Sequence, residues 1–373
     1  MGRFERIAVV AMLAACGVSS VTVAEEIKDV VARLTALPQL KAEPGFAATV
    51  LVAPGQLYDP LIMLPTGKVM WLNDDGGEEG DKGSRLLAVD TTGAVSVLAG
   101  IGKLLPTVGF DLAPKEFGAY AGQIFTLAQP KVAAEGALTN HVIQRLEPAH
   151  DFAVTTFCTL PDAGPKKIPG YGLDARFGPS GSPFAGRLFA ITIYNDAIYQ
   201  ITPDGKCTPF VVLDGKRYSA PTMMLFSADG QRMLVAVSEG AWDITGLGPQ
   251  RGAILRIAAD GTIDDLPVWS GIGRPMGMDY APPGFGDYAG QLFFSDVGLY
   301  QIPVPMTQAL LADGKIYRLD KNGKAMLVAS GFHNPNALRF FNGKLWVSDI
   351  NGDFIAGKRE LPDGFIGQLE VRK

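Results

Sequence analysis

One pattern occurs six times along the chain: a proline, an apolar strand, a hairpin and a second apolar strand. The prolines that open these units are 46 to 63 residues apart, at Pro60, Pro106, Pro169, Pro221, Pro275 and Pro335. Self-similarity at such a period is typical of propeller blades, in which each repeat is a small sheet that packs only against its neighbours. The repeat therefore predicts a ring of six blades.

Most second strands are followed by two more, joined by Asp-Gly or Asn-Gly turns, which gives four strands per blade. The sixth unit supplies only three strands, NALRFF, KLWVSDI and GFIGQLEVRK. We expect FAATVLVA, residues 46–53, to be the missing outer strand, because such a closure removes open sheet edges. The predicted fold is all-β, a six-bladed β-propeller over residues 46–373, preceded by a short helix and linker at 25–45.

Composition agrees with this fold class. Glycine (45) and proline (26) are abundant among the 373 residues, and charged residues make up only 19%. Many turn formers and few Lys/Glu-rich stretches favour short strands over helices. The formal charge of −5 gives no basis for a nucleic-acid surface.

The N-terminus resembles an export signal. Arg3 and Arg6 precede an apolar stretch over residues 7–15, too short to span a bilayer. Two processing routes stay open: LAAC resembles a lipobox that would make Cys16 a lipidated terminus, and TVA ending at Ala24 resembles an ordinary cleavage site. A retained membrane anchor is the third alternative. We predict a signal peptide at 1–24 and a periplasmic or secreted protein that meets the membrane only through a lipid on Cys16.

Two cysteines follow the signal, Cys158 and Cys207. An exported chain allows them one disulfide, and two buried thiols are the alternative. No cysteine or histidine spacing indicates zinc.

The loops that leave the second strands are long, at residues 73–84, 238–252, 295–315 and 348–364. Long loops on one rim of a rigid scaffold are the usual place for binding. We therefore expect a small-molecule substrate or ligand at this face of the ring.

Oxygen-bearing side chains should meet at the mouth of the central channel. Asn73, Asp296 and Asp349 end second strands, Asn336 begins an inner strand, and their blades are neighbours once the ring closes. Converging oxygen ligands suit a hard cation such as Ca²⁺. With a metal there, His333 or Glu239 would be the catalytic base.

Structural roles compete with this hypothesis. Asp296, Asp349 and Asn336 can instead accept backbone N–H bonds from adjacent turns, and His333 can be a satisfied loop histidine. His141 and His150 are weaker candidates for proton transfer.

The carboxylates in FDL, LDA and MDY (Asp111, Asp174 and Asp279) occur only in blades with long hairpins, which favours a structural role. The acidic stretch at 74–81 lacks EF-hand spacing.

The segment NPNALRFFNGKLWVSDING resembles the unit of six-bladed propellers of the gluconolactonase, senescence-marker-protein and strictosidine-synthase type, and is similar to NHL repeats. The lactonase resemblance implies a central calcium held by Glu, Asn and Asp at strand starts, which polarises an ester carbonyl and activates water. Asn336 matches such a position, whereas Leu61, Thr222 and Met276 depart from the pattern. HNPNA at 333–337 also resembles the RNPxG signature of pyrroloquinoline-quinone sugar dehydrogenases, without its arginine and glycine.

The leading hypothesis is a metal-assisted hydrolase of a lactone or ester. The alternatives are a non-catalytic propeller that binds a ligand or protein and a quinone-dependent dehydrogenase.

Overall fold

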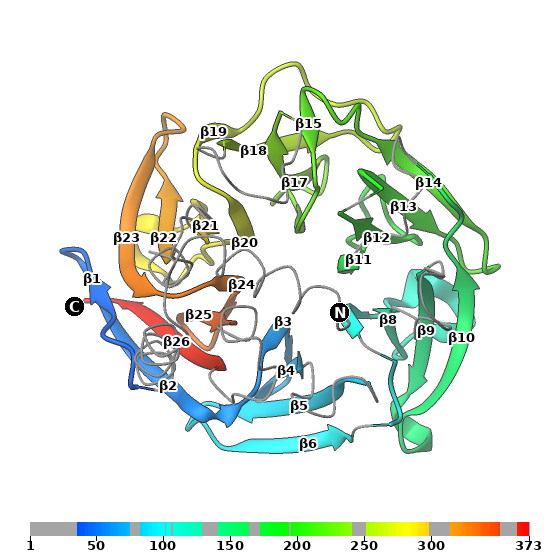
Figure 1. The fold of residues 1–373 in the computed structure, drawn as a ribbon, viewed down its shortest axis with the longest axis horizontal. Coiled ribbons are helices and arrows are strands. Elements are labelled where there is room, and N and C mark those ends of the chain that lie inside the picture. The colour runs from blue at the N-terminus through cyan, green and yellow to red at the C-terminus, as the bar shows by residue number, and fades with distance from the viewer. Residues whose placement is uncertain are drawn as a thin grey trace, which may run out of the picture.

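A computed structural model describes residues 36–74, 83–100, 102–105, 107–128, 141–163, 172–193, 195–240, 251–297, 314–350 and 364–372. Within these residues, six antiparallel sheets stand around a central axis (Figure 1). The six-bladed β-propeller predicted from the repeat is confirmed.

The first three blades take their four strands consecutively from the chain. Blade one contains β3 (Pro60–Thr66), β4 (Val69–Asp74), β5 (Arg85–Asp90) and β6 (Val95–Ala99). Blade two contains β7 (Thr107–Leu112), β8 (Ile124–Ala128), β9 (Val142–Glu147) and β10 (Ala153–Thr159). Blade three contains β11 (Gly172–Phe177), β12 (Leu188–Thr192), β13 (Ala197–Ile201) and β14 (Cys207–Val212).

The next two blades keep this order, and each gains a short strand. Blade four contains β15 (Tyr218–Ser219), β16 (Met224–Phe226), β17 (Met233–Glu239), β18 (Arg251–Ile257) and β19 (Trp269–Ile272). Blade five contains β20 (Pro275–Tyr280), β21 (Leu292–Asp296), β22 (Gly314–Leu319), β23 (Ala325–Phe332) and, on its outer edge, β1 (Lys41–Ala42).

Blade six joins the two parts of the chain that lie farthest apart in sequence. It contains β24 (Pro335–Phe341), β25 (Lys344–Asp349), β26 (Gly364–Val371) and the N-terminal β2 (Phe46–Leu57). β2 pairs with β26 from Phe46 opposite Val371, so the predicted closing strand is confirmed. Residues 36–45 contain β1 and no helix, and the rest of the stretch predicted as helix and linker lies outside the described residues. The N-terminal segment thus binds blade five through β1 and blade six through β2.

The second strand of each blade is buried on both of its faces. Every residue of β8, β12 and β21 is buried, whereas the outer strand β10 alternates between exposed and half-buried positions. A second strand lies between the two neighbouring blades and loses the polar face that a half-exposed strand keeps. This explains why these strands, such as IFTLA and LFAIT, are apolar at nearly every position.

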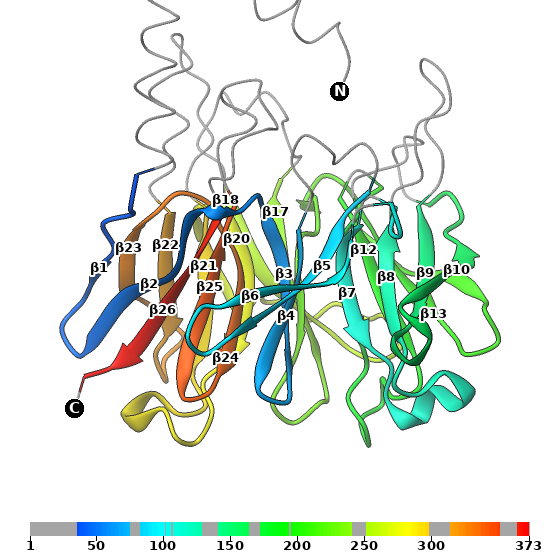
Figure 2. The same cartoon turned by 90° about the horizontal axis from the view of Figure 1, so that it is seen from below.

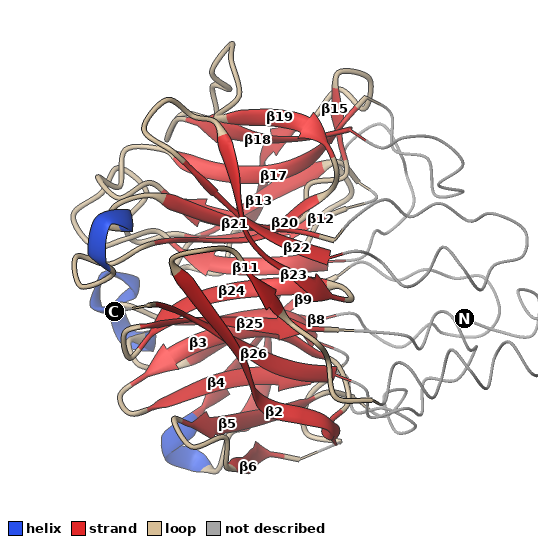
Figure 3. Cartoon of the chain, turned by 90° about the vertical axis from the view of Figure 1, so that its left-hand side faces the viewer, coloured by secondary structure: helices blue, strands red, loops and turns tan. Residues whose placement is uncertain are grey.

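The three long hairpins lie on one face of the ring, called the hairpin face from here on. Two of them contain the 3-10 helices η2 (Lys115–Tyr120) and η4 (Gly286–Tyr288), which Figures 2 and 3 show on the same side. Each hairpin buries one phenylalanine against an aromatic ring of the next blade, with centroid distances of 4.8, 5.1 and 4.7 Å for Phe117–Phe177, Phe184–Phe226 and Phe285–Phe340. The hairpins therefore pack neighbouring blades together.

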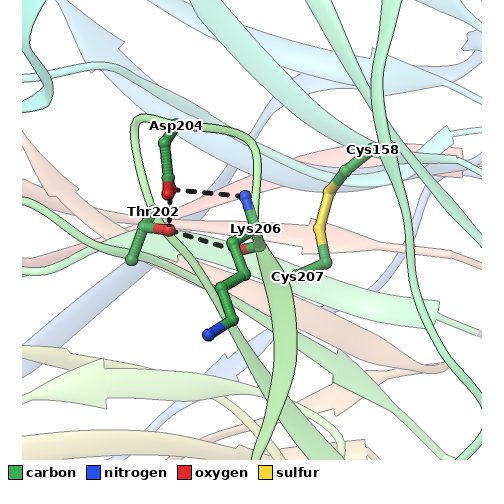
Figure 4. Close-up of a disulfide and its surroundings, with 5 residues drawn as sticks. All are labelled: Cys158, Thr202, Asp204, Lys206 and Cys207. Atoms are coloured by element: carbon green, nitrogen blue, oxygen red, sulfur yellow. Dashed lines mark hydrogen bonds between the residues drawn. A yellow bond between two sulfur atoms is a disulfide. The ribbon is translucent and has the colours of Figure 1, made fainter.

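A disulfide joins Cys158 on β10 to Cys207 on β14 (Figure 4). The Cα atoms are 6.5 Å apart and the residues are 49 positions apart in sequence. Of the two alternatives that the sequence left open, the structure has the bonded pair, which links the outer strands of blades two and three.

No helix within the described ranges is long and apolar enough to cross a membrane. The predicted signal peptide and Cys16 lie outside those ranges.

Candidate functional site

The face opposite the hairpins, called the loop face from here on, carries the residues predicted to form a site. Three second strands end there in a polar dipeptide whose last member is an aspartate: Asn73-Asp74, Ser295-Asp296 and Ser348-Asp349. Most of each long loop lies outside the described residues, namely 75–82, 241–250, 298–313 and 351–363, so the site is described from the strand ends.

Each of these aspartates receives backbone N–H bonds from the segment just before the inner strand of its own blade. Asp296 accepts the N–H of Arg274 at 2.8 Å, and Asp349 accepts those of His333 at 2.8 Å and Asn334 at 3.1 Å. In blade one, Asp74 accepts the N–H of Asp59 at 3.1 Å and pairs with Arg85. Asp296 and Asp349 thus accept backbone N–H bonds, as the structural alternative predicted. The donors lie before the inner strand and not in the turn that follows each aspartate.

The residue before each aspartate completes this arrangement. Asn73 Oδ1 accepts the N–H of Ile62, Ser295 Oγ that of Gly277, and Ser348 Oγ that of Ala337, at 2.7, 2.9 and 3.2 Å. These donors lie two residues after the opening proline, where the strand register shifts. Because proline has no N–H and a bulge breaks the ladder, the dipeptide side chains supply the missing bonds.

Both the oxygen and the nitrogen of the Asn73 side-chain amide make hydrogen bonds. In addition to Ile62, it bonds the next blade, because Nδ2 donates to the carbonyl of Thr107 at 2.8 Å. Thr222 makes a similar link from blade four to blade five, from Oγ1 to the carbonyl of Pro275 at 3.2 Å. Asn73 therefore holds blades one and two together, which fits a ligand role poorly.

Asn336 differs from the other candidates. Its side chain is 2% exposed, and Oδ1 is enclosed without a hydrogen-bond partner in the described part of the chain. Burying an unpaired amide oxygen costs about 1–3 kcal/mol, so such an atom in a native fold calls for an explanation. This buried acceptor without a partner at the start of β24 is a candidate contact for a ligand or cation.

His333 lies beside the buried carboxyl of Asp349. Its Nδ1 is enclosed 3.9 Å from Asp349 Oδ1, its ring meets Phe365 edge-on, and its side chain is 15% exposed. Burial raises the pKa of Asp349 to about 8, against the lowering effect of the two backbone N–H bonds. Asp349 thus fixes the backbone of residues 333 and 334, and the His333 ring lies between this carboxyl and Phe365.

Glu239 has other partners. It ends β17 in blade four, two blades away from His333, and its carboxylate accepts bonds from Arg251 Nε at 2.7 Å and Ser270 Oγ at 3.1 Å. These bonds tie it to its own blade, so of the two predicted bases the geometry favours His333.

The remaining histidines lie apart from blade six. His150 is exposed on blade two, where Nδ1 is 2.7 Å from Glu147 Oε2. His141 is buried at the start of β9, and burial lowers its pKa to about 4.

The repeated aspartates of the inner strands connect successive blades. One oxygen of each accepts the N–H of the next residue, and the other accepts an N–H from the following blade: Phe177 for Asp111, Met224 for Asp174 and Phe340 for Asp279, at 2.8, 3.0 and 2.7 Å. Their predicted structural role is present, although the donors are in the neighbouring blade and not in the hairpin.

Among the described residues, no group of three His, Cys, Asp or Glu side chains is placed to hold a metal ion. A calcium site at the loop face would therefore need amide oxygens such as that of Asn336.

The fold is a six-bladed propeller like those of gluconolactonase, virginiamycin B lyase and glucose dehydrogenase structures. No protein-family model matches the sequence. A search of curated proteins also finds no match.

Three solved structures illustrate the likeness. A glucose dehydrogenase matches with a TM-score of 0.56 and 13% identity, over 88% of this chain and 99% of that one. A gluconolactonase from Xanthomonas campestris matches with a TM-score of 0.52 and 13% identity, over 90% and 95%. An inactive virginiamycin B lyase variant from Staphylococcus aureus matches with a TM-score of 0.50 and 15% identity, over 88% and 100%. At such identity the likeness establishes the fold alone.

Sequence reasoning passed over two arginines, Arg176 and Arg339, in the inner strands of blades three and six. The signal was present, because they are the basic residues in the LDARF and NALRFF motifs.

Proposed function

We propose that the protein hydrolyses a lactone or ester at the loop-face mouth, beside blade six. The observation that carries this proposal is the enclosed Oδ1 of Asn336, which has no hydrogen-bond partner in the described structure. It lies at the start of β24, three residues after His333 and next to Pro335, which is paired with Asp349 at the end of β25. The structural likeness to a gluconolactonase supports a propeller scaffold for such chemistry, but fold likeness alone does not assign it.

The residues would divide the work as follows. Asn336 positions the substrate or a cation through its amide oxygen. His333, with Nδ1 enclosed against Asp349, would accept a proton from the attacking water at Nε2. Asp349 is a positioning residue, since it holds the backbone N–H groups of residues 333 and 334.

A divalent cation is part of the proposal. Asn336 fits such a site through its open oxygen. Asp296 and Asp349, which end the second strands of blades five and six, would supply carboxylate oxygens. Asn73 does not fit, because its Oδ1 and Nδ2 already bridge blades one and two. When bound, the cation would polarise the ester carbonyl and lower the pKa of water.

The test is a screen of the purified full-length chain against lactones and aryl esters, with metal content measured on the same preparation. We expect turnover that a chelator suppresses, and loss of both turnover and bound metal in Asn336→Ala. Asn322→Ala, in the exposed turn between β22 and β23, is the control and should keep both. Full activity in Asn336→Ala would exclude this mouth as the reaction site.

The second candidate is a propeller that binds a small ligand without converting it. The shared role of Asp74, Asp296 and Asp349 in holding strand starts favours it, since that role accounts for the mouth carboxylates without catalysis. A ligand-dependent rise in melting temperature with no turnover across the screen would support this candidate.

We also propose that the protein is exported. The Cys158–Cys207 bond supports this, because disulfides persist in oxidising compartments. Mass spectrometry of the mature N-terminus distinguishes a lipid on Cys16 from cleavage after Ala24, and an uncleaved chain in the cytoplasm would refute export.

A further inference from the structure

Two buried arginines lie on inner strands of the ring, toward the ends of these strands nearer the hairpin face. Arg176 is the second-to-last residue of β11 in blade three, and Arg339 lies two residues before the end of β24 in blade six. They are the only basic residues of the described inner strands, and they are 8% and 7% exposed. Blades three and six are opposite each other in the ring, and both strands border its centre (Figure 1).

Their guanidinium groups are only partly used. Arg176 Nε contacts the carboxylate of Asp174 at 3.0 Å, and Arg339 Nη1 donates to the carbonyls of Leu338 and Met278 at 2.7 and 3.0 Å. Within the described part of the chain, Nη1 and Nη2 of Arg176 and Nε and Nη2 of Arg339 make no hydrogen bond. None of these atoms is among the enclosed, unpartnered ones, so solvent or a ligand reaches them.

The two arginines converge on the inner strand of blade five. Arg339 bonds the carbonyl of Met278, and the charge of Arg176 is close enough to the adjacent Asp279 to oppose the rise in its pKa. One arginine comes from blade three and the other from blade six, so both of these opposite blades place a basic residue near the inner strand of blade five.

The acceptors around this pair are already occupied. Both oxygens of Asp111, Asp174 and Asp279 receive backbone N–H bonds. Burial also raises the pKa of all three carboxyls. The site thus has unused charged donors and few unused acceptors, which is the arrangement that recognises an oxyanion.

We propose that Arg176 and Arg339 bind a small oxyanion, a carboxylate or a phosphate group, at the hairpin end of the channel. This site is separate from the loop-face mouth, because Arg339 lies three residues, or about 10 Å, along β24 from Asn336. It does not depend on the proposed hydrolysis.

The test is thermal unfolding of the full chain in inorganic phosphate, in acetate and in chloride at matched ionic strength. We expect phosphate or acetate to raise the melting temperature by about 2 °C or more over chloride, by mass action on the folded state. The anion that acts identifies the group: phosphate alone indicates a phosphate site, and both indicate a carboxylate-tolerant one. No rise over chloride in either anion would overturn the proposal.

Variants assign the effect to these residues. Arg339→Gln should weaken the dissociation constant of the active anion at least tenfold, whereas Arg339→Lys, which keeps the charge, should weaken it less. Asp279→Asn removes a nearby negative charge and should tighten binding, a change that a purely structural role would not produce. Arg232→Gln, at an exposed ion pair of blade four, is the control and should bind as the natural chain does. Equal binding by Arg339→Gln and the natural chain would also refute the site.

Discussion

Asp279 of blade five accepts the backbone N–H of Phe340 of blade six at 2.7 Å. The same phenylalanine packs its ring 4.7 Å from that of Phe285, which the long hairpin of blade five buries. Phe340 of blade six is therefore bound to blade five twice, by the hydrogen bond of its backbone and by the packing of its ring. The equivalent pairs recur from blade two to three, through Asp111 and Phe117 onto Phe177.

The first prediction concerns this inter-blade contact. Asp279→Ala leaves two partly buried N–H groups, those of Phe340 and Tyr280, without an acceptor and should lower the free energy of unfolding by about 2–3 kcal/mol. Asp279→Asn keeps one acceptor oxygen and should cost about half as much. Urea unfolding measures both. Equal stability of the natural chain and Asp279→Ala would show that the bond does not hold the blades.

The second prediction concerns Asn336. Its enclosed oxygen makes no hydrogen bond to any described residue, so Asn336→Leu, which is close in volume and apolar, should leave stability unchanged or raise it by about 1 kcal/mol. The same variant should lose ligand binding and activity. Such a gain in stability with a loss of function is typical of sites that bury polar groups for a ligand. A loss of more than about 2 kcal/mol in urea would mean that the amide has a structural role.

The third prediction concerns the disulfide. Its closed loop spans 49 residues, and replacing both Cys158 and Cys207 by serine should lower stability by about 2–4 kcal/mol. Thermal unfolding with and without reductant measures the effect, and the double variant should not respond to reductant. Two free thiols in protein purified from an oxidising compartment would contradict the bonded pair.

The fourth prediction concerns pH. Burial lowers the pKa of His141 from 6.5 to about 4, so between these values the unfolded chain binds a proton that the folded chain does not. Stability from neutral His141 is therefore complete above pH 6.5 and is lost as pH falls toward 4, where the loss reaches about 3 kcal/mol.

The matched variant for this prediction is His141→Gln. The raised carboxyl pKa values elsewhere act in the opposite direction, so the quantity to measure is the difference in unfolding free energy between His141→Gln and the natural chain. It should shift in favour of the variant between pH 7 and pH 4. A difference that does not change with pH would refute the assignment.

The repeat made the architecture predictable because every blade packs between two similar neighbours and therefore needs the same pattern of apolar residues and turns. In each blade a proline opens or precedes the inner strand, the second strand is apolar because it is buried on both faces, and glycines occupy the turns. These features recur once per blade, so the sequence itself shows the period. The closing strand at 46–53 was predictable for the same reason, since the sixth repeat was one strand short. β1 was not, because two residues against the edge of β23 leave no periodic signal.

The candidate site was less predictable because side-chain polarity does not say what a group bonds. Asn73 and Asn336 have the same chemistry and similar places at strand ends. Only the three-dimensional register shows that one bridges two blades while the other has an unpartnered oxygen. Arg176 and Arg339 lie in repeats more than 160 positions apart, and only ring closure places them across one channel.

The pairing of Phe46 with Val371 also sets an order of assembly. The ribosome releases β2 early, yet its partner β26 emerges only after five other blades have been made. Until then, the hairpin of β24 and β25 has no third strand and both β2 and β25 present open edges, which are templates for wrong pairing. Joining strands more than 300 residues apart adds a slow, non-local step, so ring closure should be the last event in folding and the one most exposed to aggregation.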